Sequence, residues 1–588
     1  MVDINYQKRK NSELFKTLEC YDFVDTQNYI PIYNKFFSLN ETNYNSVNLN
    51  HDWYLTNIKE NIVDNKNLYN CTIKHQTTQK IKNKNVFFKL APLIDPFKYL
   101  IGKYNPNDQK LYRLPLLTSE LNNFNSKFID PNNASYVDSF FSFLNSRLIH
   151  KHNFIHGVDF YGSFLSIKNN FVLNIFDDID YLNKSDYFNK NKNVLFQVED
   201  YNFLFDEDEE TPKLPPIKID HTNSVRSNIS IKSIDESMFE NVFSDEIVSL
   251  ETLKERSLDL VDVNDLQVQT NITTTLKSGS TCSSRSSYTE NDDNSCCDKE
   301  EGQNQNEFQS DNDDNDDDDE IYEDCDSESN CNEERINAVI PKFPVQIICM
   351  EQCENTFDDL ILNEELSEME WYSAFMQIIM ILITYQKMFA FTHNDLHTNN
   401  VMYNKTDKEF IYYCYRKKYY KVPTFGRIFK IIDFGRSIYK FNGKLFCSDS
   451  FQAGGDAATQ YNTEPYFNDK KPRLEPNYSF DICRLACSIF DYMIEDLESI
   501  KNLDECEPVT KLIVEWCLDD KGVNLLYKND GSDRYPDFKL YKMIARCVHN
   551  HTPQAQLERK EFSSFAISKN KLPENAKIMN IDEYPSYV

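Results

Sequence analysis

Apolar residues recur at helical spacing over residues 371–389. Successive apolar positions in this segment lie 4, 3, 4, 3 and 4 residues apart, which aligns their side chains along one face of a helix. The pattern predicts an amphipathic core helix whose buried face carries Trp371, Phe375, Ile378, Leu382, Tyr385 and Phe389. Similar spacing predicts a helix from 134 to about 151, with Asn133 as its N-cap, and another helix that begins at Ser479.

Shorter segments alternate between the two faces of a strand. In residues 85–91, one face would carry Val86, Phe88 and Leu90. The opposite face would carry Phe87, Lys89 and Ala91. Apolar runs at 154–165, 345–350 and 427–432 predict further strands, and residues 412–420 are typical of a hairpin. Helices and strands together predict an α+β fold.

Neither pattern continues through residues 201–335. Acidic residues dominate there, as in the run D-N-D-D-N-D-D-D-D-E at 311–320. Such a composition cannot bury enough apolar surface to offset the chain entropy lost on folding. We therefore expect a disordered acidic insertion. The chain then divides into an N-terminal extension (1–75), a first folded part (76–200), the insertion (201–335), a short continuation (336–353) and a C-terminal part (354–588).

Charge and composition limit the classes of partner that this chain can bind. The 588 residues carry a formal net charge of −31, which argues against nucleic acid as the main partner because phosphate binding needs clustered Lys and Arg. The N-terminus has no apolar signal core, and the most apolar run, 378–383, is too short to span a bilayer. The 16 cysteines contain no C-x₂-C pair. We expect a soluble, intracellular protein that binds neither nucleic acid nor membrane.

Two short motifs carry the chemistry. Residues 393–400 read H-N-D-L-H-T-N-N, and residues 433–435 read D-F-G after an apolar strand. Phosphoryl transfer needs one carboxylate to orient a hydroxyl and two oxygen ligands for Mg²⁺ on the nucleotide. Asp395, Asn400 five positions later, and Asp433 supply that set. The plainer alternative for Asp395 and Asn400 is a polar loop that caps a helix.

Together these motifs resemble the H-R-D-L-x-x-x-N and D-F-G motifs of the protein kinase superfamily, and most of all the serine/threonine-protein kinases of giant DNA viruses of amoebae. The resemblance implies a two-lobed fold with a small β-rich N-lobe, interrupted by the insertion, and a larger helical C-lobe. It also implies transfer of the ATP γ-phosphate to a protein substrate, in host cytoplasm or in virus particles. Asp395 would orient the hydroxyl, with His393 and His397 beside it, and Asn400 and Asp433 would hold Mg²⁺ or Mn²⁺.

The same resemblance implies a nucleotide site upstream. Lys89 lies where the V-A-I-K lysine contacts the α- and β-phosphates, although an edge lysine that reaches water is the alternative. Residues 345–353 resemble the kinase hinge. There Met350 would lie behind the adenine, and the backbone of Glu351 and Cys353 would bond its edge. Met402 would form the floor beneath the adenine.

Several positions depart from the family pattern. No G-x-G-x-x-G precedes Lys89, and Phe87 stands where a small residue is usual. The helix at 134–151 has no Glu to pair with Lys89, so Asp138 is either that partner or a first-turn acid favoured by the helix dipole. Asn394 replaces the Arg that binds a phosphorylated activation loop, and His397 replaces the Lys that steadies the γ-phosphate.

Two other functions remain open on sequence alone. A pseudokinase scaffold would account for these departures, and small-molecule kinases of the aminoglycoside or choline type share the H-x-D-L-H-x-x-N pattern. Asp481, at the start of the helix that follows Ser479, resembles the buried kinase Asp that accepts hydrogen bonds from the catalytic loop. Its alternative is again a helix-dipole role.

Overall fold

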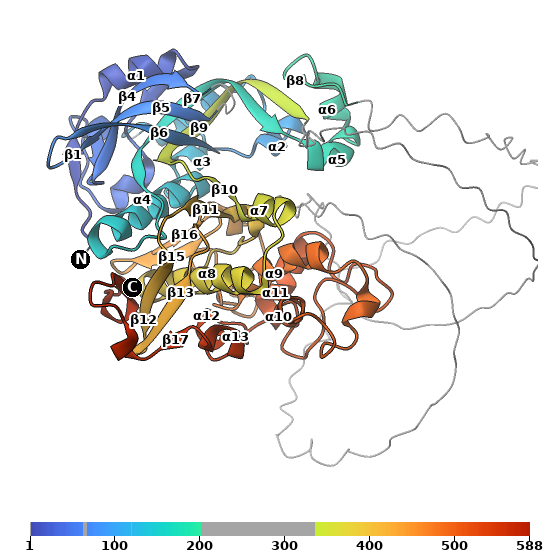
Figure 1. Ribbon diagram of the computed structural model, residues 1–588. Coiled ribbons are helices and arrows are strands. Elements are labelled where there is room, and N and C mark those ends of the chain that lie inside the picture. Colours follow the sequence, from blue (N-terminus) through green and yellow to red (C-terminus); the bar gives the residue numbers. More distant parts are fainter. Residues whose placement is uncertain (1, 63–66, 119, 202–335) are drawn as a thin grey trace, which may run out of the picture. The chain divides into compact units, whose positions relative to one another are not determined.

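A seven-stranded antiparallel sheet dominates the first part of the structure, a computed structural model that describes residues 2–62, 67–118, 120–201 and 336–588 (Figure 1). Its hydrogen-bonded order is β2-β7-β9-β6-β5-β4, and β8 pairs with β9 outside this path. The strands are β2 (Phe23–Gln27), β4 (Trp53–Asn61), β5 (Leu68–His75), β6 (Ile81–Pro92), β7 (Phe160–Asn174), β8 (Gln197–Val198) and β9 (Asn337–Glu351).

The sequence led us to expect that residues 1–75 form an N-terminal extension. In the structure they are part of this sheet instead. They supply β2, β4 and β5, and β4-β5-β6 form a continuous antiparallel meander. The pattern was obscured because the β4–β5 register shifts between Leu55 and Asn57 and again between Ile58 and Glu60. Such bulges place the buried Leu55 and Ile58 three positions apart, which breaks the period of two.

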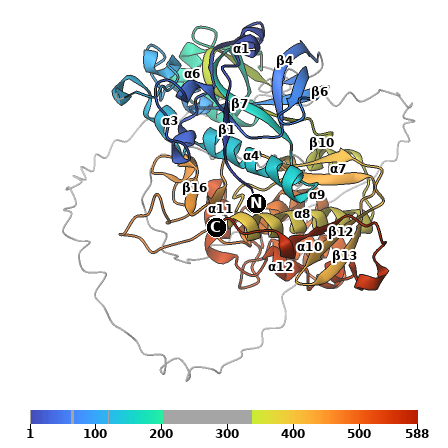
Figure 2. The same ribbon diagram turned by 90° about the vertical axis from the view of Figure 1, so that its left-hand side faces the viewer.

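The helix α4 (Ala134–His152) confirms the prediction for 134–151 and its N-cap, since Asn133 Oδ1 accepts a hydrogen bond from the Ser135 N–H at 3.0 Å. Two views show α4 between the large sheet and α8 (Figures 1 and 2). The Tyr385 hydroxyl donates to Asn145 Oδ1 at 2.8 Å, which joins α8 to α4. α4 therefore connects the sheet to the helical part of the chain.

The long helix α8 (Glu368–Phe389) is the predicted amphipathic core helix, and all six residues of its predicted face are buried. It begins with a capping box in which Ser367 accepts from the Glu370 N–H and Glu370 accepts from the Ser367 N–H. Three short sheets accompany it. They contain β10 (Asn355–Thr356), β11 (Val401–Lys405) and β14 (Arg427–Ile431), then β12 (Phe410–Tyr415), β13 (Lys418–Pro423), β17 (Ala566–Ile567) and β18 (Ile578–Asn580), then β15 (Ile438–Phe441) and β16 (Lys444–Cys447).

The other helices are short apart from α9, the helix predicted to begin near Ser479. In the C-terminal part they are α7 (Phe357–Asn363), α9 (Phe480–Met493), α10 (Pro508–Trp516), α11 (Phe538–Cys547), α12 (Pro553–Gln556) and α13 (Lys560–Ser563). In the N-terminal part they are α1 (Ser12–Glu19), α2 (Pro96–Leu100), α3 (Ser126–Ile129), α5 (Ile179–Asn183) and α6 (Asp186–Asn191), with a small strand pair β1 (Tyr6–Lys8) and β3 (Val47–Leu49). The structure thus has the mixed α+β content that the sequence predicts.

The expected acidic insertion lies outside the described residues, apart from Tyr201. Its two flanks meet in the sheet, because β8 pairs with the start of β9 and the Glu199 N–H donates to the Asn337 carbonyl at 3.0 Å. The chain therefore leaves the sheet and re-enters it at neighbouring points.

We expect deletion of residues 202–335, with a short Gly/Ser join, to leave the melting temperature within about 3 °C of wild type. Joining adjacent flanks costs little entropy, because loop closure depends only logarithmically on length. Differential scanning calorimetry of both proteins measures the effect. A fall of about 10 °C or more would show that the segment contributes to the folded core.

Candidate active site

The ammonium of Lys89 lies between two carboxylates. Lys89 Nζ is 2.6 Å from Asp138 Oδ2 on α4 and 2.8 Å from Asp433 Oδ1 in the D-F-G segment. Asp138 uses its other oxygen as well, since Oδ1 accepts from the Phe434 N–H at 3.0 Å. Three elements far apart in sequence therefore meet at Lys89. This contact decides between the two interpretations of Asp138: it is the acidic partner of the strand lysine.

Burial and charge oppose each other in this cluster. Burial disfavours the Lys89 ammonium, but Asp138 and Asp433 raise its pKa above the usual value, so it stays charged. Burial also disfavours the Asp433 carboxylate, yet Lys89 lowers its pKa to about 2. Burial raises the pKa of Asp138 despite Lys89. One cation and two carboxylates leave an excess of negative charge, which favours a metal cation at this point.

Asp481 holds the loop at 393–400 through hydrogen bonds to its backbone. It is fully buried at the start of α9, and its two oxygens accept the N–H groups of His393 and Asn394, each at 2.9 Å. The predicted hydrogen bonds to the catalytic-loop backbone are thus confirmed, and Asp481 is more than a first-turn acid. Burial raises the pKa of Asp481, whereas the two N–H groups favour its ionised form.

Asn394 adopts the left-handed backbone region, with φ 65°, which Asn tolerates better than most residues. Its amide nitrogen donates to the Arg436 carbonyl at 2.9 Å, and its Oδ1 accepts from the Tyr461 hydroxyl at 2.8 Å. The Asn394 side chain therefore binds the segment after D-F-G through neutral hydrogen bonds.

Asp395 is held at both oxygens. The Tyr541 hydroxyl on α11 donates to Oδ1 at 2.8 Å, and Arg436 Nη1 lies 3.6 Å from Oδ2. Sequence reasoning missed both residues. Arg436 directly follows D-F-G, so its position was a usable signal, whereas Tyr541 lies 146 residues after Asp395 and no local pattern points to it.

Asn400 and Asp433 have side-chain oxygen atoms that could bind a cation. The Asn400 amide nitrogen donates to the Asp395 carbonyl at 2.9 Å and to His397 Nε2 at 3.0 Å, which leaves Oδ1 as its metal-binding atom. Asp433 contacts Lys89 and the Gly435 N–H through Oδ1, and its side chain is 45 % exposed. Two oxygen donors fit Mg²⁺, which typically takes one or two protein ligands and completes its octahedron with phosphates and water. Among the described residues, no group of three or more His, Cys, Asp and Glu could hold a metal by itself.

The two histidines of the loop have different surroundings. His393 is fully buried and its Nε2 donates to the Ile432 carbonyl at 2.9 Å, which ties the loop to the residue directly before Asp433. Burial lowers the pKa of His397 to about 4, so its imidazole is neutral. Because His397 Nε2 accepts from Asn400, its proton is on Nδ1.

The expected hinge is tied to neighbouring strands through one side chain. Glu351 Oε2 pairs with Lys430 at 3.0 Å and accepts from the Asp159 N–H at 3.0 Å, while Oε1 accepts from Asn404 at 2.9 Å. Met350, the last residue but one of β9, pairs with Phe87 of β6, the strand that also carries Lys89.

The other two expected adenine contacts are Cys353, two residues after the end of β9, and Met402 in β11. Burial raises the pKa of the Cys353 thiol to about 12, so it is protonated. Met402 is half-buried in β11, between Thr356 of β10 and Lys430 of β14. No contact that joins Met402 to Met350 defines an adenine pocket among the described residues.

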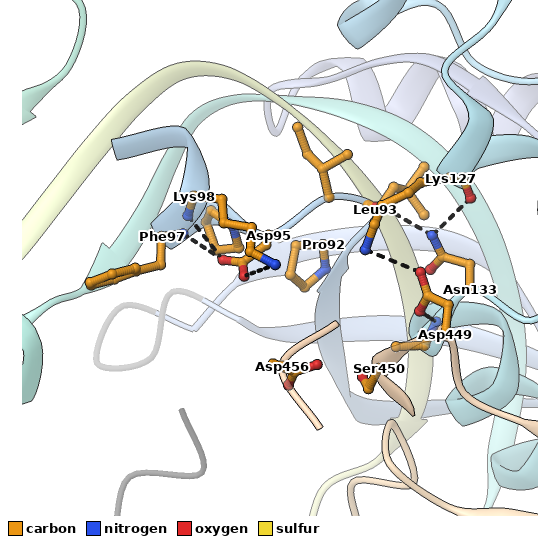
Figure 3. Close-up of a pocket in the computed structure, with 13 residues that line it drawn as sticks. Pro92, Leu93, Asp95, Phe97, Lys98, Lys127, Asn133, Asp449, Ser450 and Asp456 are labelled. Carbon is orange, nitrogen blue, oxygen red and sulfur yellow. Dashed lines mark hydrogen bonds and ion pairs between the residues drawn. The ribbon is translucent and has the colours of Figure 1, made fainter. Parts of the chain in front are cut away.

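A pocket of about 220 Å³ lies beside the N-terminus of α4 (Figure 3). Asp449, from the segment after D-F-G, accepts from the Ala134 N–H at 2.9 Å and pairs with Lys127 at 3.1 Å. The Asp449 N–H in turn donates to the Asn132 carbonyl at 2.7 Å. A carboxylate thus holds this segment against the start of α4, where the helix dipole favours negative charge.

Comparison with models of protein families gives no match, and neither does comparison with curated proteins. In the part of the chain that the structure describes, every helix is too short or too polar to cross a bilayer.

We expect Asp481→Ala to lower the free energy of unfolding by at least about 2 kcal/mol, because two buried N–H groups lose their acceptor. Urea denaturation measures this change. Asp469→Ala, which removes an exposed carboxylate, is the matched control and should alter stability by less than about 0.5 kcal/mol. Equal stability of the two variants would mean that Asp481 does not hold the loop.

Proposed function

We propose that this chain is an ATP-dependent phosphotransferase with a two-lobed kinase fold that acts on serine or threonine hydroxyls of a protein. The observation that carries the proposal is the junction of Lys89 with Asp138 and Asp433, beside a loop that presents Asp395 and Asn400. Phosphoryl transfer depends on such placement of charge, with little covalent chemistry by the protein.

Each group has a distinct task in this proposal. Lys89 binds the nucleotide phosphates from β6, and Asp433 holds its ammonium in place. Asn400 Oδ1 and Asp433 hold Mg²⁺ or Mn²⁺, which neutralises charge on the phosphates when it is bound. Asp395, fixed at Oδ1 by Tyr541, orients the substrate hydroxyl through Oδ2.

The contacts favour an enzyme over a scaffold. A chain that only binds partners does not need a permanently charged lysine between a buried carboxylate and a second, half-exposed one, since removing such charges from water carries a desolvation penalty. The charged cluster persists even though no glycine-rich segment precedes Lys89. The D-F-G segment and the hinge-like strand favour a protein hydroxyl over a small molecule as acceptor.

We expect Asp395→Ala and Lys89→Met to fail differently. Asp395→Ala should keep nucleotide affinity and lower transfer by about 10²–10⁴-fold, as lost acid–base assistance does. Lys89→Met should weaken nucleotide binding, because a phosphate contact is removed. Binding of a fluorescent ATP analogue and ³²P transfer to a generic protein measure the two effects. If the wild type binds no nucleotide with either metal, the enzyme proposal fails and the scaffold remains.

We expect Asp433→Asn to abolish metal-dependent transfer while the protein stays folded. The variant loses a charged metal ligand, and Lys89 keeps Asp138 as its partner. Transfer measured against Mg²⁺ and Mn²⁺ concentration, with circular dichroism as the check on folding, tests the assignment. Wild-type activity at wild-type metal concentrations would rule out Asp433 as a metal ligand.

A further inference from the structure

The loop that presents Asp395 lacks a fixed positive charge of its own. His397 occupies the position where the family has a lysine, and its Nε2 accepts a hydrogen bond from the Asn400 amide at 3.0 Å. Transfer of a phosphoryl group develops negative charge on oxygen next to the attacking hydroxyl, and a nearby cation stabilises that charge. Lys89 and the metal act on the nucleotide phosphates in the proposed function, so a further cation beside Asp395 would have to come from outside this loop.

Arg436 is the cation in contact with Asp395. Its Nη1 lies 3.6 Å from Asp395 Oδ2, the oxygen that Tyr541 leaves for the substrate. Arg436 and Asp395 are 7 % and 6 % exposed, so a hydroxyl that reaches Asp395 also comes next to the guanidinium. Nη1 is buried and makes no hydrogen bond of normal geometry, which leaves its N–H groups for a phosphoryl oxygen.

The rest of the guanidinium is fixed in place. Nε and Nη2 both donate to Asp456 Oδ2, at 3.2 and 2.7 Å. Asp456 belongs to the segment after D-F-G and lines the pocket of Figure 3. Burial disfavours the charge on Arg436, but Asp395 and Asp456 raise its pKa further above its usual value. Its positive charge is therefore permanent and its orientation is set by Asp456.

We propose that Arg436 supplies positive charge at the site of transfer beside Asp395, and that Asp456 positions it. This inference rests on the proposed function. It makes Arg436 a catalytic residue that contacts the transferring phosphoryl group, and Asp456 a positioning residue that acts through Arg436. The two N–H groups of Nη1 stay on the arginine throughout, so it stabilises charge without transferring a proton.

A charge-relocation experiment tests the inference. Arg436→Gln should lower kcat by about 10²-fold, the loss typical of removing one stabilising donor, with nucleotide affinity within about threefold of wild type. In the Arg436→Gln background, His397→Lys introduces an ammonium two residues along the loop from Asp395 and should restore kcat at least about tenfold, part of that loss. A purely structural role for Arg436 predicts no rescue, because a lysine at 397 cannot replace the bonds to Asp456.

Two further variants separate the outcomes. Lys440→Gln removes an exposed cation four residues away and should leave kcat unchanged. Asp456→Asn should lower kcat without loss of nucleotide binding. Suppose the wild type transfers phosphate. Full activity of Arg436→Gln would then overturn this inference and leave the proposed function intact. Failure of His397→Lys to restore activity to Arg436→Gln would do the same. Absence of transfer by the wild type, despite nucleotide binding, would overturn the proposed function.

Discussion

The position of the candidate site depends on one half-buried ammonium, that of Lys89. Lys89 is charged in a place where an unpaired charge would be very unfavourable, so β6, α4 and the D-F-G segment must stay where their side chains can neutralise it. Asp138 strengthens this dependence because its second oxygen binds the Phe434 N–H. A shift of α4 relative to the sheet would break both contacts at once. The same excess of carboxylates that fixes Lys89 also makes the exposed side of Asp433 suitable for a cation.

A second buried carboxylate, that of Asp481, fixes the loop that carries Asp395. Asp481 accepts two consecutive loop N–H groups, and this arrangement holds Asn394 in the left-handed region. The loop then directs Asp395 toward Arg436 and Tyr541. Two buried acids on different helices, Asp138 and Asp481, therefore orient the two motifs toward each other. Neither acid is placed in contact with reactants; both act on the backbone and on charged neighbours.

The sequence predicted what depends on local periodicity and short spacing. The helix at 371–389, the strand around Lys89 and the N-cap Asn133 follow from patterns that span a few turns or a few strand residues. What could not be predicted depends on contacts between distant segments. Strands β4 and β5 were missed because bulges break their alternation, and Tyr541 because its bond to Asp395 spans 146 residues. The role of Asp138 stayed open because only the packing of α4 could decide it.

The departures from the kinase pattern have structural counterparts, and this bears on whether the site is degenerate. A shorter acid than the usual Glu is in contact with both Lys89 and the Phe434 N–H. Asn394 lacks the charge of an arginine, yet it binds the Arg436 carbonyl and Tyr461. A site that had lost its function would keep isolated motif residues, while their surroundings would drift independently. Here both side-chain oxygens of Asp138 and both polar side-chain atoms of Asn394 have partners, and the Arg436 guanidinium lies 3.6 Å from Asp395. The altered positions therefore form a mutually consistent set, which is the pattern expected of a site under continuing chemical constraint.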